Sequence, residues 1–177
     1  MAWQTKSSQV VFENSWLRVE DRDVINPAGH PTRYGVVHFK NRAVGVVAMT
    51  DDRQVYLVGQ SRYPLASYSW EIPEGGCPNG EALEVAALRE LSEETGLKAA
   101  HLQPLLTLHL SNSVTDEQAH LYLATGLTQG EQHLEESEDI TVRCVAFSEA
   151  LAMIDQGLIT DAITVAALLA VDRQLCR

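Results

Sequence analysis

The chain has 177 residues, of which 45% are hydrophobic, and its formal net charge at pH 7 is −11. This length suits one domain with a full hydrophobic core and a small appended element. The negative charge repels the phosphate backbone of extended nucleic acid, so we expect no nucleic-acid partner. Because no run of 18 apolar residues occurs and the first ten residues lack the apolar stretch of a secretory signal, we also expect a cytoplasmic protein with no membrane partner.

The cysteines give a further limit. Cys77, Cys144 and Cys176 show no Cys-x-x-Cys spacing, and their number is odd. This pattern argues against a disulfide framework and against a structural zinc site.

Residues 1–40 are expected to form an N-terminal β element. β-branched and aromatic residues cluster within residues 10–25, an Asn-Pro-Ala-Gly turn follows at 26–29, and a strand pattern resumes at 33–40. Such an element is too small to bury a core of its own. We therefore expect it to pack on the main domain, residues 41–177, or on a second subunit.

The next two apolar segments, residues 43–50 and 54–60, are predicted to form a central hairpin around the Asp-Asp-Arg turn at 51–53. Arg62 follows them and leads toward a glycine-rich loop. Its guanidinium is a candidate to bind a substrate phosphate or carboxylate, and a surface ion pair is the alternative.

A short extended segment follows at residues 70–73. Glu71 stands between apolar neighbours and is a candidate to hydrogen-bond the base or sugar of a substrate, with a buried structural carboxylate as the alternative. Trp70 is a candidate to stack on a base, although a single tryptophan in this context also suits a hydrophobic core.

Residues 82–95 are predicted to form a helix, which Asn79 or Gly80 can start and Gly96 can end. On this helix Glu90, Glu93 and Glu94 fall within roughly a 100° arc of one face. Three carboxylates so close repel one another unless a cation compensates, and carboxylate oxygens suit hard divalent cations such as magnesium. A solvated acidic face is the alternative.

The spacing around this helix is specific. Five residues separate Gly75 from Glu81, seven separate Glu81 from Arg89, and the segment Arg-Glu-Leu-Ser-Glu-Glu-Thr-Gly-Leu completes the pattern at 89–97. This arrangement resembles the Nudix box at each of its defined positions. The likeness to the Nudix hydrolase superfamily extends over residues 43–169 and implies an α/β (α+β) fold in which a mixed β-sheet lies between helices.

The resemblance also implies roles for the residues of the box. Mg²⁺ or Mn²⁺ is the implied cofactor, with Glu90 and Glu94 as its main ligands and Glu93 as a third ligand or a base. A backbone carbonyl at Glu74 or Gly75 completes the implied ligand set. The implied orienting pair is Arg89 with Glu81.

Outside the box, the chain looks most like the ADP-ribose pyrophosphatase group. The likeness rests on the N-terminal β element, on Gln-x-Arg-x-Pro at 60–64, on Trp-Glu-x-Pro at 70–73, and on an acidic segment at 129–139. It implies a homodimer that hydrolyses a small nucleotide sugar to a nucleoside monophosphate and a sugar phosphate. A late-loop glutamate, Glu136 or Glu138, is implied to assist catalysis.

One departure leaves the substrate open. The ADP-ribose group usually carries a proline about fifteen residues beyond the box, and this chain has Asn112 there. Hydrolysis of a GDP- or UDP-linked hexose is therefore an alternative, as is cleavage of nucleoside triphosphates. A non-catalytic nucleotide-sugar sensor is a further alternative, although every carboxylate of the box is present.

The remainder of the chain completes the expected domain. Strand patterns occur at residues 101–110, 120–127 and 140–147. Ser148 is predicted to cap a helix that Gly157 ends, and residues 161–176 are predicted to form a last amphipathic helix.

Overall fold

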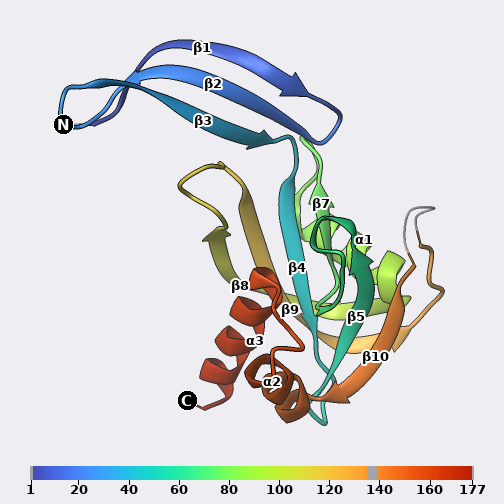
Figure 1. The fold of residues 1–177 in the computed structure, drawn as a ribbon. Coiled ribbons are helices and arrows are strands. Elements are labelled where there is room, and N and C mark those ends of the chain that lie inside the picture. Colours follow the sequence, from blue (N-terminus) through green and yellow to red (C-terminus); the bar gives the residue numbers. More distant parts are fainter. Residues whose placement is uncertain (1, 135–138, 177) are drawn as a thin grey trace.

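A computed structural model describes residues 2–134 and 139–176. The first three strands, β1 (Gln4–Glu13), β2 (Leu17–Ile25) and β3 (Pro31–Phe39), form an antiparallel sheet in that order. Figure 1 shows this N-terminal sheet, drawn in blue, lying across one end of the rest of the chain. The turn at 26–29 closes as expected, because the side chain of Asn26 accepts the backbone N–H groups of Ala28 and His30.

The rest of the chain, which we call the body, contains two further sheets. The larger is mixed, with strand order β7-β4-β9-β8, and its β4 and β9 run parallel. The smaller is antiparallel, with order β10-β5-β6. The strand bounds are β4 (Arg42–Ala48), β5 (Gln54–Arg62), β6 (Ser67–Glu71), β7 (Glu74–Cys77), β8 (Leu97–His109), β9 (Gln118–Gln129) and β10 (Thr141–Ala146).

Helices cover both faces of the mixed sheet (Figure 1). Successive side chains of a strand point to opposite faces, so Val44 and Val46 of β4 pack toward α1 (Leu83–Thr95), whereas Val47 joins the core beneath α2 (Phe147–Asp155) and α3 (Ala162–Leu175). The result is a mixed β-sheet between helices, which confirms the predicted fold class.

The predicted central hairpin is wrong. The chain does turn tightly at 50–54, where the backbone N–H of Thr50 donates to the carbonyl of Gln54 at 2.9 Å. The two strands then diverge, because β4 pairs with β7 and β9 while β5 pairs with β6 and β10. A single isolated bridge, Met49 to Val55, is all that pairs them within the described residues.

The helix ends differ slightly from the prediction. The helix α1 begins at Leu83 after Ala82, two or three residues later than Asn79 or Gly80 would start it. Ser148 lies inside the first turn of α2, which begins at Phe147, and therefore is not its cap. Gly96 ends α1 in the left-handed conformation as predicted, with φ of 72°.

The last helix is capped by a side chain. Asp161 accepts the backbone N–H of Thr164 at 2.7 Å, as an N-cap carboxylate does. No helix in residues 2–134 and 139–176 is both long and apolar enough to cross a membrane.

Candidate functional site

The site lies where β7 meets the acidic face of α1. Glu90 and Glu94 are buried there, and the backbone N–H of Glu74 donates to Oε2 of Glu94 at 2.9 Å. Gly75 lies directly against Glu90, because a Cβ added at this glycine would be 2.3 Å from Cδ of Glu90. The glycine of the box is therefore required by the close approach of a carboxylate to the strand backbone.

Arg89 joins the loop to the helix. Its guanidinium donates to both carboxylate oxygens of Glu81, at 3.1 and 3.0 Å, and to the carbonyl of Gly76 at 2.8 Å. Its Nη1 also donates to Glu90 at 2.8 Å and to Glu93 at 2.9 Å. These bonds hold the pKa of Glu81 below its usual range. The expected pairing of Arg89 with Glu81 is present, and Arg89 pairs with Glu93 as well.

The donor chemistry of the site fits a hard divalent cation. Glu90 and Glu94 present carboxylate oxygens beside the backbone of Glu74 and Gly75, and carboxylate and carbonyl oxygens are the ligands that magnesium and manganese prefer. Within the described residues, no three His, Cys, Asp or Glu side chains meet closely enough to hold an ion. Glu90 and Glu93 each direct a carboxylate oxygen to Nη1 of Arg89.

A cavity of about 980 Å³ opens over these groups. Glu90, Glu93 and Glu94 line it together with the glycine turn, and its other wall carries Trp16 and Arg62. This volume is large enough for a nucleotide-sized ligand. The site therefore combines a cavity, a carboxylate cluster and nearby cationic side chains.

Arg62 does not stand free in the cavity. It forms a forked ion pair with buried Glu71, and its Nη2 lies 3.2 Å from Oε1 of Glu74. Glu71 is thus a buried carboxylate paired with an arginine. About a third of the Arg62 side chain, 35%, remains exposed toward the cavity.

Glu74 occupies an unusual electrostatic position. Burial raises the pKa of its carboxyl well above the usual range, and the nearby carboxylates of Asp161 and Glu71 raise it further. Its Oε2 is buried without a hydrogen-bond partner among the described residues. Such a group has unmet capacity to bind a cation or a hydrogen-bond donor.

For Trp70 the structure favours the alternative of a place against the hydrophobic core. Side chains alternate along β6, so Ser69 and Glu71 face a cavity of about 400 Å³, while Tyr68 and Trp70 point to the opposite face. There the Trp70 ring packs edge-on to Tyr68, and the guanidinium of Arg143 lies 5.0 Å from its centre. Trp70 therefore belongs to the packing of the body.

Sequence reasoning missed the aromatic side chains that do line the site. Trp16 from the β1–β2 turn and Phe39 from the end of β3 both line a cavity of about 350 Å³ beside Gly75 and Arg62. Trp16 is 67% exposed. The Asn-Ser-Trp turn gave a local signal, because Asn14 accepts the backbone N–H of Trp16 at 2.9 Å, but nothing in the sequence brings that turn to the box.

Glu136 and Glu138 lie outside the described residues. The segment that precedes them, after β9, is hydrogen-bonded to the C-terminal end of α1. The backbone N–H of Gly130 donates to the carbonyl of Gly96 at 2.7 Å. The N–H of His133 donates to the carbonyl of Glu93 at 3.0 Å.

Comparison with known proteins agrees with this geometry. The NUDIX domain matches residues 39–166, and the nucleoside diphosphate sugar hydrolase N-terminal domain matches residues 3–37. The chain is 34% identical to the methanol dehydrogenase activator of Bacillus methanolicus, over 93% of this chain and 89% of that protein. It is 32% identical to the ADP-ribose pyrophosphatase of Bacillus subtilis, over 93% and 90%.

A solved structure supports the fold. The crystal structure of an ADP compounds hydrolase superposes with a TM-score of 0.89 at 23% identity, covering 99% of this chain and 95% of the other. At that identity the likeness concerns the arrangement of the backbone, including the N-terminal sheet.

Proposed function

Because this chain belongs to the NUDIX domain family, we propose that it hydrolyses the pyrophosphate bond of ADP-ribose or a related nucleoside diphosphate sugar. The observation that carries the proposal is the set of box carboxylates lining a nucleotide-sized cavity. The match of residues 3–37 to the N-terminal domain of nucleoside diphosphate sugar hydrolases supports this substrate class, as does the ADP-ribose pyrophosphatase of Bacillus subtilis.

As a Nudix hydrolase the chain requires a divalent cation, and the proposed ion is Mg²⁺ or Mn²⁺. Glu90 and Glu94 would hold it, with Glu93 and a backbone carbonyl at Glu74 or Gly75 as further ligands. A bound cation offsets the charge of the pyrophosphate and acidifies a coordinated water. Arg89 acts by fixing the directions of the Glu90 and Glu93 carboxylates.

In the proposed reaction, water attacks one phosphorus, and the bond between that phosphorus and the bridging oxygen breaks. The bridging oxygen leaves with the other phosphorus, so the products are a nucleoside monophosphate and a sugar phosphate. A carboxylate takes the proton of the attacking water. Glu136 is the preferred base, because it best matches the late-loop glutamate that the family resemblance implies, with Glu138 and Glu93 as alternatives.

The substrate's base is proposed to stack on Trp16. Two hydrogen bonds fix the backbone of Trp16 in the β1–β2 turn. The side chain of Asn14 accepts the N–H of Trp16, and the carbonyl of Trp16 accepts the N–H of Lys40 at 2.9 Å. An exposed aromatic ring on a fixed backbone suits stacking. The exposed part of Arg62 is the proposed contact for a substrate phosphate, with Glu71 holding its guanidinium in place.

The proposal includes two further expectations. Residues 1–40 act as a dimerisation and substrate-covering element attached to the Nudix domain of residues 41–177, and the protein is a cytoplasmic homodimer. The alternatives in substrate would use the same proposed metal site. A GDP- or UDP-hexose differs from ADP-ribose in its base and its sugar, whereas a nucleoside triphosphate carries a third phosphate in place of the sugar.

The first test is turnover of ADP-ribose, GDP-mannose, UDP-glucose and ATP with Mg²⁺, followed by the substitution Glu94→Gln. This change removes one proposed metal-ligand charge, and we expect kcat to fall about 100-fold or more, because metal stabilisation of the reaction is worth several kcal/mol. The matched control is Glu84→Gln, an exposed carboxylate of the same helix that lies outside the cavity, which should leave kcat unchanged.

Two results would contradict the proposal. Failure of the wild-type protein to release product from any of the four compounds would remove the enzymatic function and favour a non-catalytic sensor. Equal kcat values for the Glu94→Gln and Glu84→Gln proteins, at equal melting temperatures, would remove the carboxylate cluster from the mechanism.

A further inference from the structure

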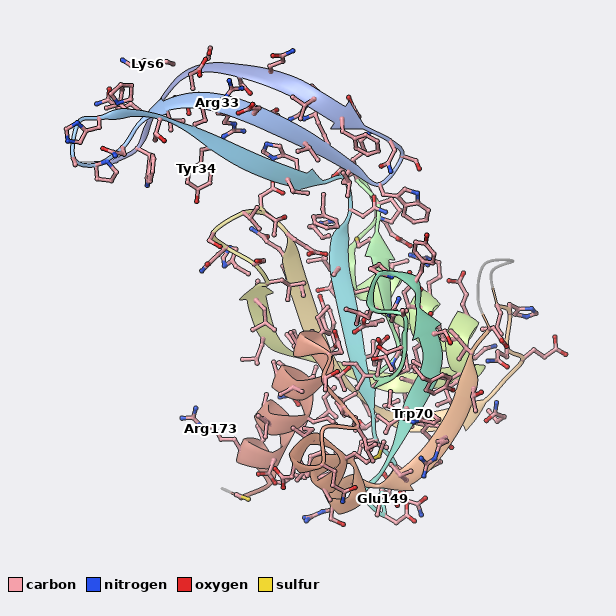
Figure 2. All side chains as sticks on the ribbon, viewed as in Figure 1. Lys6, Arg33, Tyr34, Trp70, Glu149 and Arg173 are labelled. Atoms are coloured by element: carbon pink, nitrogen blue, oxygen red, sulfur yellow. The ribbon has the colours of Figure 1, made fainter. Side chains whose placement is uncertain are left out.

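The N-terminal sheet joins the body at a joint between β3 and residues 113–116 of the β8–β9 connection. The backbone N–H of Val37 donates to the carbonyl of Val114 at 2.8 Å, and the N–H of Asp116 donates to the carbonyl of Val37 at 3.3 Å. The hydroxyl of Tyr34 donates a hydrogen bond to the carbonyl of Ser113, and Figure 2 shows the Tyr34 side chain extending from β3 toward the connection.

The side chain of Asp116 closes the joint. Its Oδ1 accepts the backbone N–H of Phe39 at 3.2 Å, and its Oδ2 lies 2.6 Å from Nδ1 of His38. On the other edge of the imidazole, Nε2 lies 2.8 Å from Nη2 of Arg22. Since a guanidinium only donates, Nε2 accepts and Nδ1 carries the proton that Asp116 accepts. A chain of bonds thus runs from Arg22 of β2 through His38 to Asp116.

This joint is connected directly to the walls of the site. Phe39, whose N–H Asp116 accepts, lines the cavity beside Gly75. The next residue, Lys40, donates its N–H to the carbonyl of Trp16. Glu117 follows Asp116 in the chain and lines the same cavity. A change at the joint is therefore transmitted through one or two residues to Trp16, Phe39 and Glu117, which all line this cavity.

From these contacts we propose that Asp116 is a positioning residue for substrate binding: with His38 it fixes the N-terminal sheet so that Trp16 and Phe39 face the carboxylate site of the same chain. The inference rests on the proposed function. Asp116 itself touches neither the box carboxylates nor the reacting atoms, so its effect belongs to substrate affinity and is transmitted through the backbone of β3.

The test is a double-mutant cycle on KM for ADP-ribose with Mg²⁺. Asp116→Ala removes two hydrogen bonds to a carboxylate, and we expect KM to rise about tenfold with a smaller change in kcat, the pattern of lost binding. Trp16→Ala should also raise KM. Because Asp116 acts by holding Trp16, the double variant should exceed Trp16→Ala by less than about threefold, whereas independent effects would multiply.

Two additional variants separate positioning from general stability. Asp116→Asn keeps one acceptor for the N–H of Phe39 and should give a KM between those of wild type and Asp116→Ala. Asp21→Ala removes an exposed ion pair with Arg33 inside the N-terminal sheet, away from the joint, and should leave KM unchanged.

The outcomes distinguish this inference from the proposed function. If wild type turns over ADP-ribose but Asp116→Ala leaves KM unchanged, the inference alone is overturned. Multiplicative effects of Asp116→Ala and Trp16→Ala overturn it as well, as does an equal rise in KM for Asp21→Ala. A wild-type protein that neither hydrolyses nor binds, by calorimetry with Mg²⁺, any of the four compounds named above overturns both.

Discussion

At the scale of single residues, Gly75 sets the position of Glu90. A Cβ at this position would lie 2.3 to 2.4 Å from the three terminal atoms of the Glu90 side chain, well inside contact distance. In Gly75→Ala the carboxylate must leave its place beside the strand. We expect kcat to fall at least about tenfold and the free energy of unfolding to fall by about 1–3 kcal/mol, the usual cost of overpacking.

Steady-state kinetics and urea unfolding of Gly75→Ala measure these two changes. The control is Gly35→Ala, because Gly35 in β3 has an ordinary strand conformation and no atom within 4 Å of an added Cβ. That variant should be neutral in both assays. A Gly75→Ala protein with wild-type kcat would show that the close contact with Glu90 is not needed for catalysis.

Single residues also show which parts of the site can be predicted from the sequence. Gly75, Glu81, Arg89 and the three glutamates of the helix have fixed spacings from which their proximity can be predicted, and Arg89 does bond to Glu81, Glu90 and Glu93. Trp70 and Trp16 show the limit. Proximity in sequence to the box favoured Trp70, but strand alternation turns it away, and Trp16 reaches the cavity from 59 residues before Gly75.

At the scale of elements, α1 ends at a glycine with two separate constraints. Gly96 has φ of 72°, and an added Cβ would lie 3.0 Å from Nε2 of Gln129 and from the backbone nitrogen of Gln132. Gly157 has a similar φ of 70° with nothing within 4 Å. In Gly157→Ala only backbone strain remains, at a cost of about 1 kcal/mol.

Gly96→Ala should therefore lower the free energy of unfolding by more than Gly157→Ala, about 2–3 kcal/mol, because crowding adds to strain. Urea titrations of the two variants and wild type give the comparison directly. Equal losses would mean that the segment after β9 yields to the added methyl group. Since Gly130 and His133 bond to this end of α1, a larger loss would show that the segment is held firmly there.

Elements were predictable where local rules decide them. The end of α1 at Gly96 and the last helix, predicted at residues 161–176 and found as α3, depend on neighbours in the chain, and the structure agrees with both. The pairing of β4 depends on distant partners: Ala43 faces Ala119 across a parallel register, 76 residues away in sequence. The short turn at 51–53 favours a hairpin locally, but β4 pairs with β7 and β9 instead of with β5.

At the scale of the whole molecule, the N-terminal sheet is strongly exposed. All ten residues of β1 are exposed, and within the described residues its outer edge pairs with no strand. The sheet carries Val10, Val11 and Phe12 on that edge strand, each about half exposed. A three-stranded sheet gains little stability without a covered face, and an open edge invites pairing with another chain. These features support the proposed homodimer.

Light scattering should therefore give twice the chain mass of 19.5 kDa at micromolar concentration. Val11→Lys places a charge on the proposed interface, and we expect it to shift the mass toward one chain, because burying an unpaired ammonium is costly. The matched control is Val85→Lys on α1, since Val85 is 57% exposed and Val11 is 55%. A wild-type mass of one chain, or an equal shift in both variants, would refute a dimer built on β1, because only an interface at the N-terminal sheet separates these two valines.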